Sequence, residues 1–381
     1  MTEPQLAMVV DQSAQGALKR CLIAASGGMS MMIDSDPSVL YHSPRSLKLV
    51  VTDAYHLMQV LHCLPDRPQV RVVVCSSDLG APMLTLALTD PRIVGFLAWR
   101  EVGIRPWELT YLVRSVLLPS ETPPRAAELM VWGSSSITWC PQTSLDRDAA
   151  VGAVELVARQ FGVGRRLATL ASDAAHELLM NAMYNAPVDQ WGKPRYEHDR
   201  GAEIHLADHE VPSLQLTVDH AHLALECVDP FGRLDRHHLL SGVLRGHHGE
   251  VDHAGSGGGI GLFRLFSSAS ILRAEVVPGH RTSVSWIVDR TLDHRERYTT
   301  PRSLYFVTGR ERATALYQIL AWAHREGNVK AVARIRLRTL PYAVVEGLNV
   351  KNLQPTMKCS PALLQRIRTA ASTVVGRTCP Y

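Results

Sequence analysis

The sequence has few cysteines for its length, and none of them stands in a C-x-x-C pair. Seven cysteines are scattered over 381 residues, which is an odd number for a protein held together by disulfides. Disulfide scaffolds need paired cysteines, and the common zinc modules need them at regular spacing. The pattern therefore fits a reducing cytoplasm better than a disulfide scaffold.

Long apolar runs are also absent. No stretch approaches the length needed to cross a bilayer, and the first residues, Met1 to Pro4, show no basic region followed by an apolar one. We expect a soluble, cytoplasmic protein with no membrane partner.

Aromatic residues make up 6% of the chain, and no strand-like segment carries the spaced aromatics of an RNA-binding sheet. We find no helix-turn-helix pattern, internal repeat or low-complexity tract. With 46% hydrophobic and 20% charged residues the chain is globular. Its length indicates two or three domains.

One stretch rich in alanine and leucine carries polar residues at helical spacing. Residues Ser172 to Ala186 favour a helix, and Glu177 and Asn181 lie four residues apart, so they share a face that Asn185 extends. A carboxylate and an amide oxygen on one face suit a water molecule and a magnesium ion. An amphipathic core helix with a wet side gives the same pattern.

Two further segments follow this helix. Asp229 ends the apolar run Leu223 to Val228, which reads as a strand; it suits a contact to an exocyclic amine, or a turn before Pro230 and Gly232. The glycine-rich stretch from Gly255 then leads into an apolar helix-length run. Glycines before a helix N-terminus suit phosphate binding, although a flexible loop has the same composition.

Together these segments resemble the ATP-binding domain shared by histidine kinases, type II topoisomerases, heat-shock chaperones and the serine kinases that act as anti-sigma factors, the GHKL or Bergerat fold. The resemblance covers roughly residues 149–289 and implies an α+β two-layer sandwich that binds ATP and Mg²⁺. It implies that Glu177 is the base or water-orienting group and that Asn181 is the magnesium ligand. The nucleotide site implied in this way comprises Asn181, Asn185, Asp229, Gly232, Gly257, Gly259, Gly261, Leu262 and Thr282.

Within that resemblance Asp229 contacts adenine, the three later glycines cradle phosphate, and Gly279 with Thr282 forms a last glycine-threonine element on a closing strand. One departure stands out, because Phe231 occupies the place of the first glycine after the aspartate. The short lid between Asp229 and Gly255 also holds five histidines. These histidines suit either a zinc site or a solvated lid: His237, His238, His247, His248 and His253.

The first hundred or so residues have a different pattern, in which short apolar runs alternate with helix-length segments. The runs are Leu6 to Val10, Met29 to Ile33, Leu47 to Val51, Val70 to Cys75 and Ile93 to Leu97; the helical segments are Ser13 to Ala25, Ala54 to Leu64 and Pro106 to Leu118. This alternation predicts a doubly wound parallel sheet with its functional crevice at the carboxyl ends of the strands.

That organisation resembles the receiver domain of response regulators. The resemblance implies an acidic site at Asp11 and Asp53 with a hydroxyl at Ser76 or Ser77. The expected lysine after the fifth strand is replaced by Trp99 and Arg100, and the acidic pair is reduced to one aspartate. We favour a pseudo-receiver that works by protein contact over a phosphorylated one; an unrelated doubly wound domain remains the plainer alternative.

Charge is segregated along the chain. From residue 290 to 381 there are sixteen Lys and Arg against five Asp and Glu, whereas the preceding residues carry 24 basic against 31 acidic side chains. Arg334, Arg336 and Arg338 alternate as on one face of a strand, and Ser360 with Pro361 suits a helix start. This basic α+β region is solvated or internally paired, or else it binds an acidic protein or nucleic acid.

The expected order is a receiver-like domain at 1–119, a proline-rich linker and the start of the second domain at 120–148 with a strand near Leu129 to Trp132, an ATP-binding domain at 149–289, and the basic region at 290–381. The leading hypothesis is a bacterial signalling regulator that binds ATP-Mg²⁺ and controls a protein partner, with serine-kinase activity or homodimerisation as options. The alternatives are a non-catalytic interaction module and a DNA-associated regulator that uses the basic region.

Overall fold

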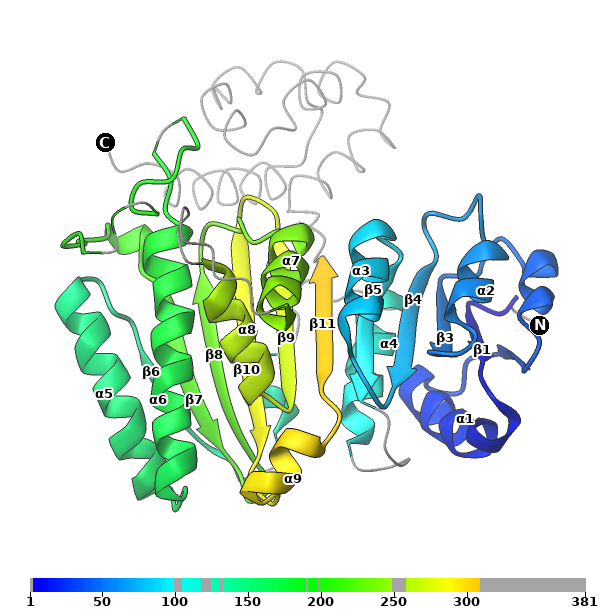
Figure 1. Cartoon of the computed structure of the whole chain (residues 1–381), viewed down its shortest axis with the longest axis horizontal. Helices are drawn as coiled ribbons and strands as arrows, with labels where there is room; N and C mark the ends of the chain where they lie inside the picture. Colours follow the sequence, from blue (N-terminus) through cyan, green and yellow to red (C-terminus); the bar gives the residue numbers. More distant parts are fainter. Residues whose placement is uncertain are drawn as a thin grey trace, which may run out of the picture. The chain divides into compact units, whose positions relative to one another are not determined.

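The computed structural model describes residues 3–98, 105–117, 125–130, 133–189, 191–197, 199, 201–248 and 258–308. Within them one mixed sheet of 11 strands runs in the order β2-β1-β3-β4-β5-β11-β9-β10-β8-β7-β6 (Figure 1). The general α/β prediction is confirmed.

The first half of the sheet is parallel. Its strands are β1 (Leu6–Val9), β2 (Met31–Asp34), β3 (Leu49–Asp53), β4 (Arg71–Ser76) and β5 (Ile93–Ala98). The helical segments between and after them are α1 (Gln12–Ser26), η1 (Pro37–His42), α2 (Leu57–His62), α3 (Ala81–Thr89) and α4 (Pro106–Leu117). The strand order of this half is that of doubly wound flavodoxin-like sheets.

The second half is mostly antiparallel. Its strands are β6 (Ser135–Trp139), β7 (Ser213–Val218), β8 (His222–Asp229), β9 (Ile271–Val277) and β10 (Arg281–Asp289). The helical segments are η2 (Ala126–Leu129), α5 (Ser144–Gln160), α6 (Arg165–Met180), η3 (Asn181–Asn185), η4 (Asp208–Glu210), α7 (Arg236–His247), α8 (Gly258–Ser268) and α9 (His294–Thr299).

The last described strand, β11 (Ser303–Thr308), joins the two halves. It pairs antiparallel with β5 and parallel with β9. Gly95 makes room for this junction, because a Cβ there would lie 2.9 Å from Cδ1 of Tyr305. A strand that follows both halves in sequence therefore makes their sheets continuous.

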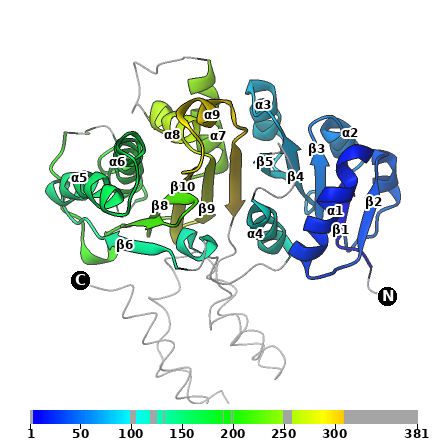
Figure 2. The ribbon, with the colours of Figure 1, turned by 90° about the horizontal axis from the view of Figure 1, so that it is seen from below.

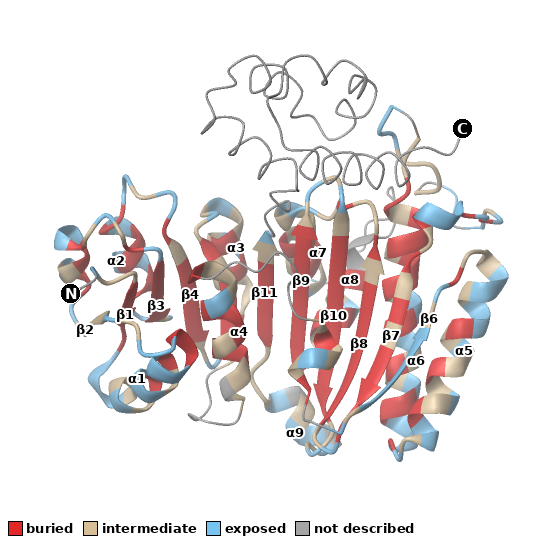
Figure 3. Ribbon diagram, turned by 180° about the vertical axis from the view of Figure 1, so that it is seen from behind, coloured by how far each residue is buried: buried red, intermediate tan, exposed pale blue. Residues whose placement is uncertain are grey.

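Helices cover the sheet on both sides. Figure 2 shows the sheet close to edge-on, with α2, α3 and α5 to α8 on one side and α1 with α4 on the other. One apolar core lies under the first group, from Leu57 and Val74 to Leu178, Leu225 and Leu265. Figure 3 shows that the central strands are buried along most of their length. The cores therefore run across the junction between the halves.

Three observations differ from the sequence prediction or add to it. The strand expected near Leu129 to Trp132 is wrong as far as the structure describes it, because Leu129 lies in the 3₁₀ helix η2 and the strand is β6. Helix α3 was not predicted. The chain divides into compact units after Gly309, while β11 belongs to the sheet although it lies inside the predicted region 290–381.

Most of that basic region, including Arg334 to Arg338 and Ser360, lies outside the described residues. Among the described helices, none combines the length and apolar character that a membrane crossing requires.

Candidate functional site

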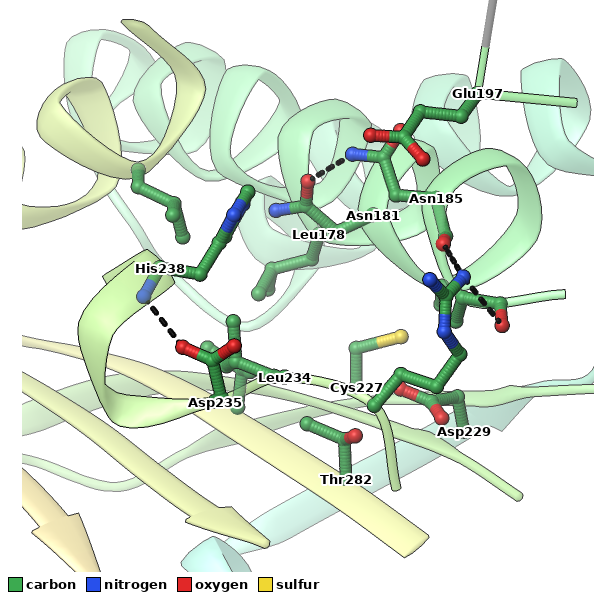
Figure 4. Close-up of a pocket in the computed structure, with 15 residues that line it drawn as sticks. Leu178, Asn181, Asn185, Glu197, Cys227, Asp229, Leu234, Asp235, His238 and Thr282 are labelled. Atoms are coloured by element: carbon green, nitrogen blue, oxygen red, sulfur yellow. Dashed lines mark hydrogen bonds between the residues drawn. The ribbon is translucent and has the colours of Figure 1, made fainter. Parts of the chain in front are cut away.

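A cavity of about 160 Å³ lies between η3 and strands β8 and β10 (Figure 4). Five residues expected at a nucleotide site line it: Asn181, Asn185, Asp229, Leu262 and Thr282. They come from four segments of the sequence, namely η3, β8, α8 and β10. Pockets for whole ligands usually measure roughly 300–1,000 Å³, so the described walls enclose a space suited to one part of a ligand, such as a flat ring.

Helix α6 brings the first polar residues to this cavity. Its buried side is made of leucine and alanine, including Leu167, Ala171 and Leu178, which pack on the sheet. The predicted helix continues as the π-helical turn η3, closed by a bond from Ala186 N to Asn181 O of 2.9 Å, and Pro187 then stops it. Such π turns occur often at functional sites.

The two asparagines of η3 are joined to each other. Asn185 Nδ2 donates to Asn181 Oδ1 at 2.9 Å, while Asn185 Oδ1 is buried without a hydrogen-bond partner among the described residues. A buried acceptor without a partner costs about 1–3 kcal/mol. A hydrogen-bond donor or a cation that enters the cavity would therefore remove this cost by contacting Asn185 Oδ1.

Asp229 closes the opposite wall at the end of β8, directly across from Thr282 of β10. Its Oδ1 accepts hydrogen bonds from Phe231 N at 2.9 Å and Gly232 N at 3.4 Å. Burial raises the pKa of this carboxyl to about 6, against the lowering effect of those two bonds and the Thr282 hydroxyl. Asp229 thus forms the turn considered from the sequence and also presents a buried, easily protonated carboxyl to the cavity.

Gly232 has a structural reason to be glycine. Its φ is +63°, and a Cβ there would lie 2.2 Å from Val277 O and 2.7 Å from His280 N. Gly279 N donates to Gly232 O at 3.2 Å. The glycine therefore locks the turn after Asp229 against the β9–β10 hairpin, and it does not line the cavity.

The glycine-rich segment leads into α8, as the sequence indicates. Gly257 lies outside the described residues, the helix begins at Gly258, and Gly259 falls in its first turn. Leu262 of α8 lines the cavity. Gly261 faces α6, where a Cβ would lie 2.3 Å from Glu177 Oε2. This glycine lets α8 approach the carboxylate closely.

Glu177 lies in an adjoining groove between α6 and α8 and does not line the cavity of Asn181. Arg264 Nη1 lies 3.4 Å from Glu177 Oε1, with the glutamate side chain 20% exposed and the arginine 71% exposed. An exposed pair of this length is weak. The carboxylate is therefore accessible and close to the cavity, and it is held loosely.

Four charged or polar residues of the cavity were not assigned to it from the sequence: Glu197, Arg233, Asp235 and His238. Arg233 Nη1 donates to Asn185 O at 2.8 Å and brackets the cavity between β8 and η3. Asp235 caps α7 by accepting from His238 N at 2.6 Å. Burial lowers the pKa of His238, so this ring favours its neutral form.

The lid histidines do not form a metal site in the described part of the chain. No group of three or more His, Cys, Asp or Glu side chains is arranged there to hold a metal ion. His237 and His238 lie on α7, and His247 packs against Phe263 with ring centroids 5.7 Å apart. His253 lies outside the described residues.

A second cluster lies at the carboxyl ends of β1 and β3, where Asp11 and Asp53 meet. Asp11 N donates to Asp53 Oδ2 at 2.8 Å, and both His56 N, at 2.9 Å, and His56 Nδ1, at 2.8 Å, contact Asp53 Oδ1. The Asp11 side chain caps α1 by accepting from Ser13, which lowers its pKa. Both carboxylates are thus engaged within the cluster.

The neighbouring strand end supplies a hydroxyl that is also engaged. Ser76 Oγ donates to Asp78 O, and Asp78 N donates back to it at 3.2 Å. Trp99 and Arg100 lie outside the described residues.

No protein-family model matches the chain, and no curated protein matches it. The chemistry of the site rests on its own residues.

Proposed function

We propose that the chain is a bacterial signalling regulator of the histidine-kinase-like ATP-binding class, which binds ATP-Mg²⁺ between η3 and β8–β10 and acts on a protein partner. The observation that carries the proposal is the single cavity built by Asn181, Asn185, Asp229, Leu262 and Thr282. Those residues were expected together because of a resemblance in sequence motifs. Helical spacing relates Asn181 to Asn185, and nothing in the spacing of Asp229, Leu262 and Thr282 along the chain requires them to meet these two.

Adenine suits the floor of this cavity. An exocyclic amine is a donor, and the Asp229 carboxyl is an acceptor held by two backbone N–H groups beside the Thr282 hydroxyl. Leu262 and Leu178 supply apolar surface for a flat ring. The modest volume of the cavity fits the base, with the remaining nucleotide directed towards the N-terminus of α8. Helix N-termini favour phosphate through their free N–H groups and partial positive charge.

The oxygen donors of η3 fit a magnesium ion. Asn181 would hold it, with the unpartnered Asn185 Oδ1 as a second oxygen ligand. Mg²⁺ prefers hard oxygen donors and keeps several waters beside substrate phosphates, so two amides suffice. When bound, the ion neutralises phosphate charge. Glu177, accessible beside the cavity, orients or deprotonates the acceptor hydroxyl in a serine-kinase reaction.

A non-catalytic interaction module is the second candidate. It is favoured by the contact of Glu177 with Arg264 and by Phe231 in place of a flexible glycine. In this case the fold binds nucleotide weakly or not at all, and it acts through its surfaces. The DNA-associated alternative depends on the basic region, whose residues beyond 308 lie outside the described structure.

For the first half we propose a pseudo-receiver that works by protein contact. Its support is the engagement of both Asp53 oxygens, one by Asp11 N and the other by His56. A carboxylate bonded in this way is a poorer phosphate acceptor than a free one, because phosphorylation would break those bonds.

Nucleotide titration tests the proposal. Wild type should bind ATP in the presence of Mg²⁺, and Asn181→Ala should weaken binding tenfold or more, about 1.4 kcal/mol. Gln160→Ala is the matched control, since it removes an exposed amide from the end of α5. Calorimetry measures each affinity. Failure of wild type to bind ATP would remove the basis of this function.

A second variant separates the two candidates. Glu177→Gln should retain ATP affinity within about twofold and lose turnover or phosphoryl transfer, since the amide cannot accept a proton. An equal rate in Glu177→Gln and wild type would exclude the kinase role of Glu177. ATP binding by wild type without hydrolysis or transfer to any partner would favour the non-catalytic module.

A further inference from the structure

A long groove runs between α6 and α8, beside the nucleotide cavity and separate from it. It consists of two adjoining hollows of about 440 Å³ and 480 Å³ that share Leu170, Ser267 and Ser268 in their walls. Figure 1 shows the two helices on the same side of the sheet, with α9 near the C-terminal end of α8. The groove therefore follows α6 from its first turn to Glu177.

One face of α6 supplies a polar wall with regular spacing. Arg166, Thr169, Asp173 and Glu177 line the two hollows, and their separations of three, four and four residues place them along one stripe. Arg166 and Glu177 lie eleven residues apart, which is roughly 16 Å of helix. An extended chain rises roughly 3.3 Å per residue. The groove thus matches about five residues of extended peptide.

The two ends of the groove have opposite charge. Arg165, Arg166 and Arg297 surround the first hollow. Arg165 and Arg166 are exposed, and Arg297 Nη2 donates to Leu292 O at 2.9 Å while its Nε is buried without a partner among the described residues. No carboxylate in the described part of the chain forms an ion pair with these three guanidinium groups. This end is suited to an anion.

The other end carries Asp173, His176 and Glu177, with Arg264 on the facing helix. Glu177 is packed against Gly261 of α8 and keeps a loose contact with Arg264. A hydroxyl brought to this end would meet a carboxylate next to the proposed nucleotide site. The groove therefore has a polarity, with an anion subsite at one end and an acceptor for a proton at the other.

We propose that this groove binds an extended segment of a partner protein, with an acidic side chain at Arg165, Arg166 and Arg297 and a serine or threonine hydroxyl about five residues away at Glu177. Docking of the acidic side chain does not require nucleotide. The placement of the hydroxyl rests on the proposed function of Glu177. The shared chemistry of the anion subsite is that of a carboxylate or a phosphorylated side chain, either of which pairs with guanidinium groups.

Charge complementarity selects an acidic partner as the occupant. The chain's own region after residue 290 carries sixteen basic against five acidic residues, and such a segment would be repelled from three arginines. The residues before it are net acidic, with 24 basic and 31 acidic side chains, so a second copy of this chain is the competing occupant. Sedimentation of the protein alone distinguishes that case.

The test uses the full-length protein and fluorescein-labelled six-residue peptides in which the first residue is Glu, phosphoserine or Gln and the sixth is Ser. The Glu and phosphoserine peptides should bind at least tenfold more tightly than the Gln peptide, and added salt should weaken their binding. Comparison of Glu with phosphoserine identifies the source of the anion.

Charge reversal locates the site. Arg165→Glu with Arg166→Glu should weaken binding of the acidic peptides tenfold or more, and Arg297→Gln should weaken it to a smaller extent. Arg20→Glu is the control, because Arg20 is an exposed arginine on α1, far from the groove in sequence. The arginines changed in the double variant are exposed, so folding should be retained.

Three results would overturn the proposal. They are equal affinity for the Gln and Glu peptides, an unchanged affinity in the double variant, and an affinity for the acidic peptides no higher than the affinity for inorganic phosphate measured by competition. Dimerisation of wild type that the double variant abolishes would assign the groove to a second copy. ATP titration on the same samples keeps the two proposals separate. Peptide binding without ATP binding would support the peptide-binding groove and contradict the proposed ATP-binding function. ATP binding without peptide binding would contradict the peptide-binding groove and leave the proposed function in place.

Discussion

Asp229 is the residue at which the proposed function and the stability of the fold are opposed. Its buried carboxyl has a pKa raised to about 6 from an ordinary value of 3.8. Well below pH 3.8 the group is neutral in both the folded and the unfolded chain, and its burial has no ionic cost. As the pH rises from 4 to 6, the unfolded chain loses its proton first. The folded state therefore becomes less stable across that window, by at most about 3 kcal/mol.

Asp229→Asn should remove this loss. The amide oxygen can still accept from Phe231 N, and no charge is buried, so we expect a higher free energy of unfolding than wild type at pH 8 and an equal one below pH 4. Urea denaturation at pH 3.5, 5, 6 and 8 measures the difference. Asp66→Asn, at an exposed position, is the control for replacing a carboxylate with an amide. The idea fails if Asp229→Asn is less stable than wild type at pH 8.

The residues of the cavity differ in how far the sequence could predict them. Asn181 and Asn185 were predictable because helical spacing fixes which side chains share a face, and Asp229 because a polar residue at the end of an apolar strand is conspicuous. Glu197 and Arg233 lie in irregular segments, where no periodicity says which way a side chain points. The same spacing argument placed Glu177 with the asparagines, whereas the structure puts it in the next groove.

At the level of elements, the packing of α7 on α8 depends on one small residue. A Cβ at Gly246 would lie 2.0 Å from Cγ of Phe263, so Gly246→Ala forces one helix or the ring to move. Overpacking costs about 1–3 kcal/mol, partly offset by a gain of about 1 kcal/mol in helix propensity. We expect a net loss of up to about 2 kcal/mol by chemical denaturation.

The control for this change is Gly152→Ala on α5, where a Cβ meets nothing within 4 Å. That variant should gain up to about 1 kcal/mol, because only the propensity term remains. The double change Gly246→Ala with Phe263→Leu should recover part of the loss if steric conflict is the cause. Equal effects of the two alanine substitutions would show that the contact carries no strain.

Strands β1 to β5 and β8 were predicted from apolar runs in the sequence, and each predicted end lies within two residues of the observed one. The buried strands β7 and β9 were not predicted. Strand β6 was not predicted in this way, because it is an edge strand with four exposed residues in Ser135–Trp139. Helix α3 escaped because its residues, APMLTLALT, are apolar on nearly every side and show little period. Strand β11 escaped because its identity depends on partners at β5 and β9, which are distant in the sequence.

The junction formed by β11 makes the described sheet continuous, and we expect it to unfold as one cooperative body. Glu108 of α4 accepts hydrogen bonds from Ser303 Oγ at 2.6 Å and from the Tyr305 hydroxyl, and Arg105 Nε lies 2.6 Å from its Oε1. Burial raises the pKa of Glu108 in spite of the arginine. Wild type should therefore show one calorimetric unfolding transition for the two halves.

Glu108→Ala leaves the guanidinium of Arg105, whose side chain is 9% exposed, without its carboxylate. Breaking such a buried pair costs about 3–5 kcal/mol, and we expect the single transition to separate into two. Asp148→Ala, which removes a carboxylate 60% exposed, should keep one transition. Two transitions already present in wild type would contradict the cooperative body.

The late position of β11 in the sequence also determines how long β5 lacks its neighbouring strand during translation. Ala98 N of β5 donates to Ser303 Oγ, which lies 205 positions later in the sequence, so the ribosome must add that length of chain before the free edge of β5 can pair with β11. At about 5–20 residues per second this takes roughly ten to forty seconds. During that interval β5 is an open edge of the nascent sheet, and such edges invite aggregation. Chaperone demand should therefore be highest while residues 99–302 are being translated.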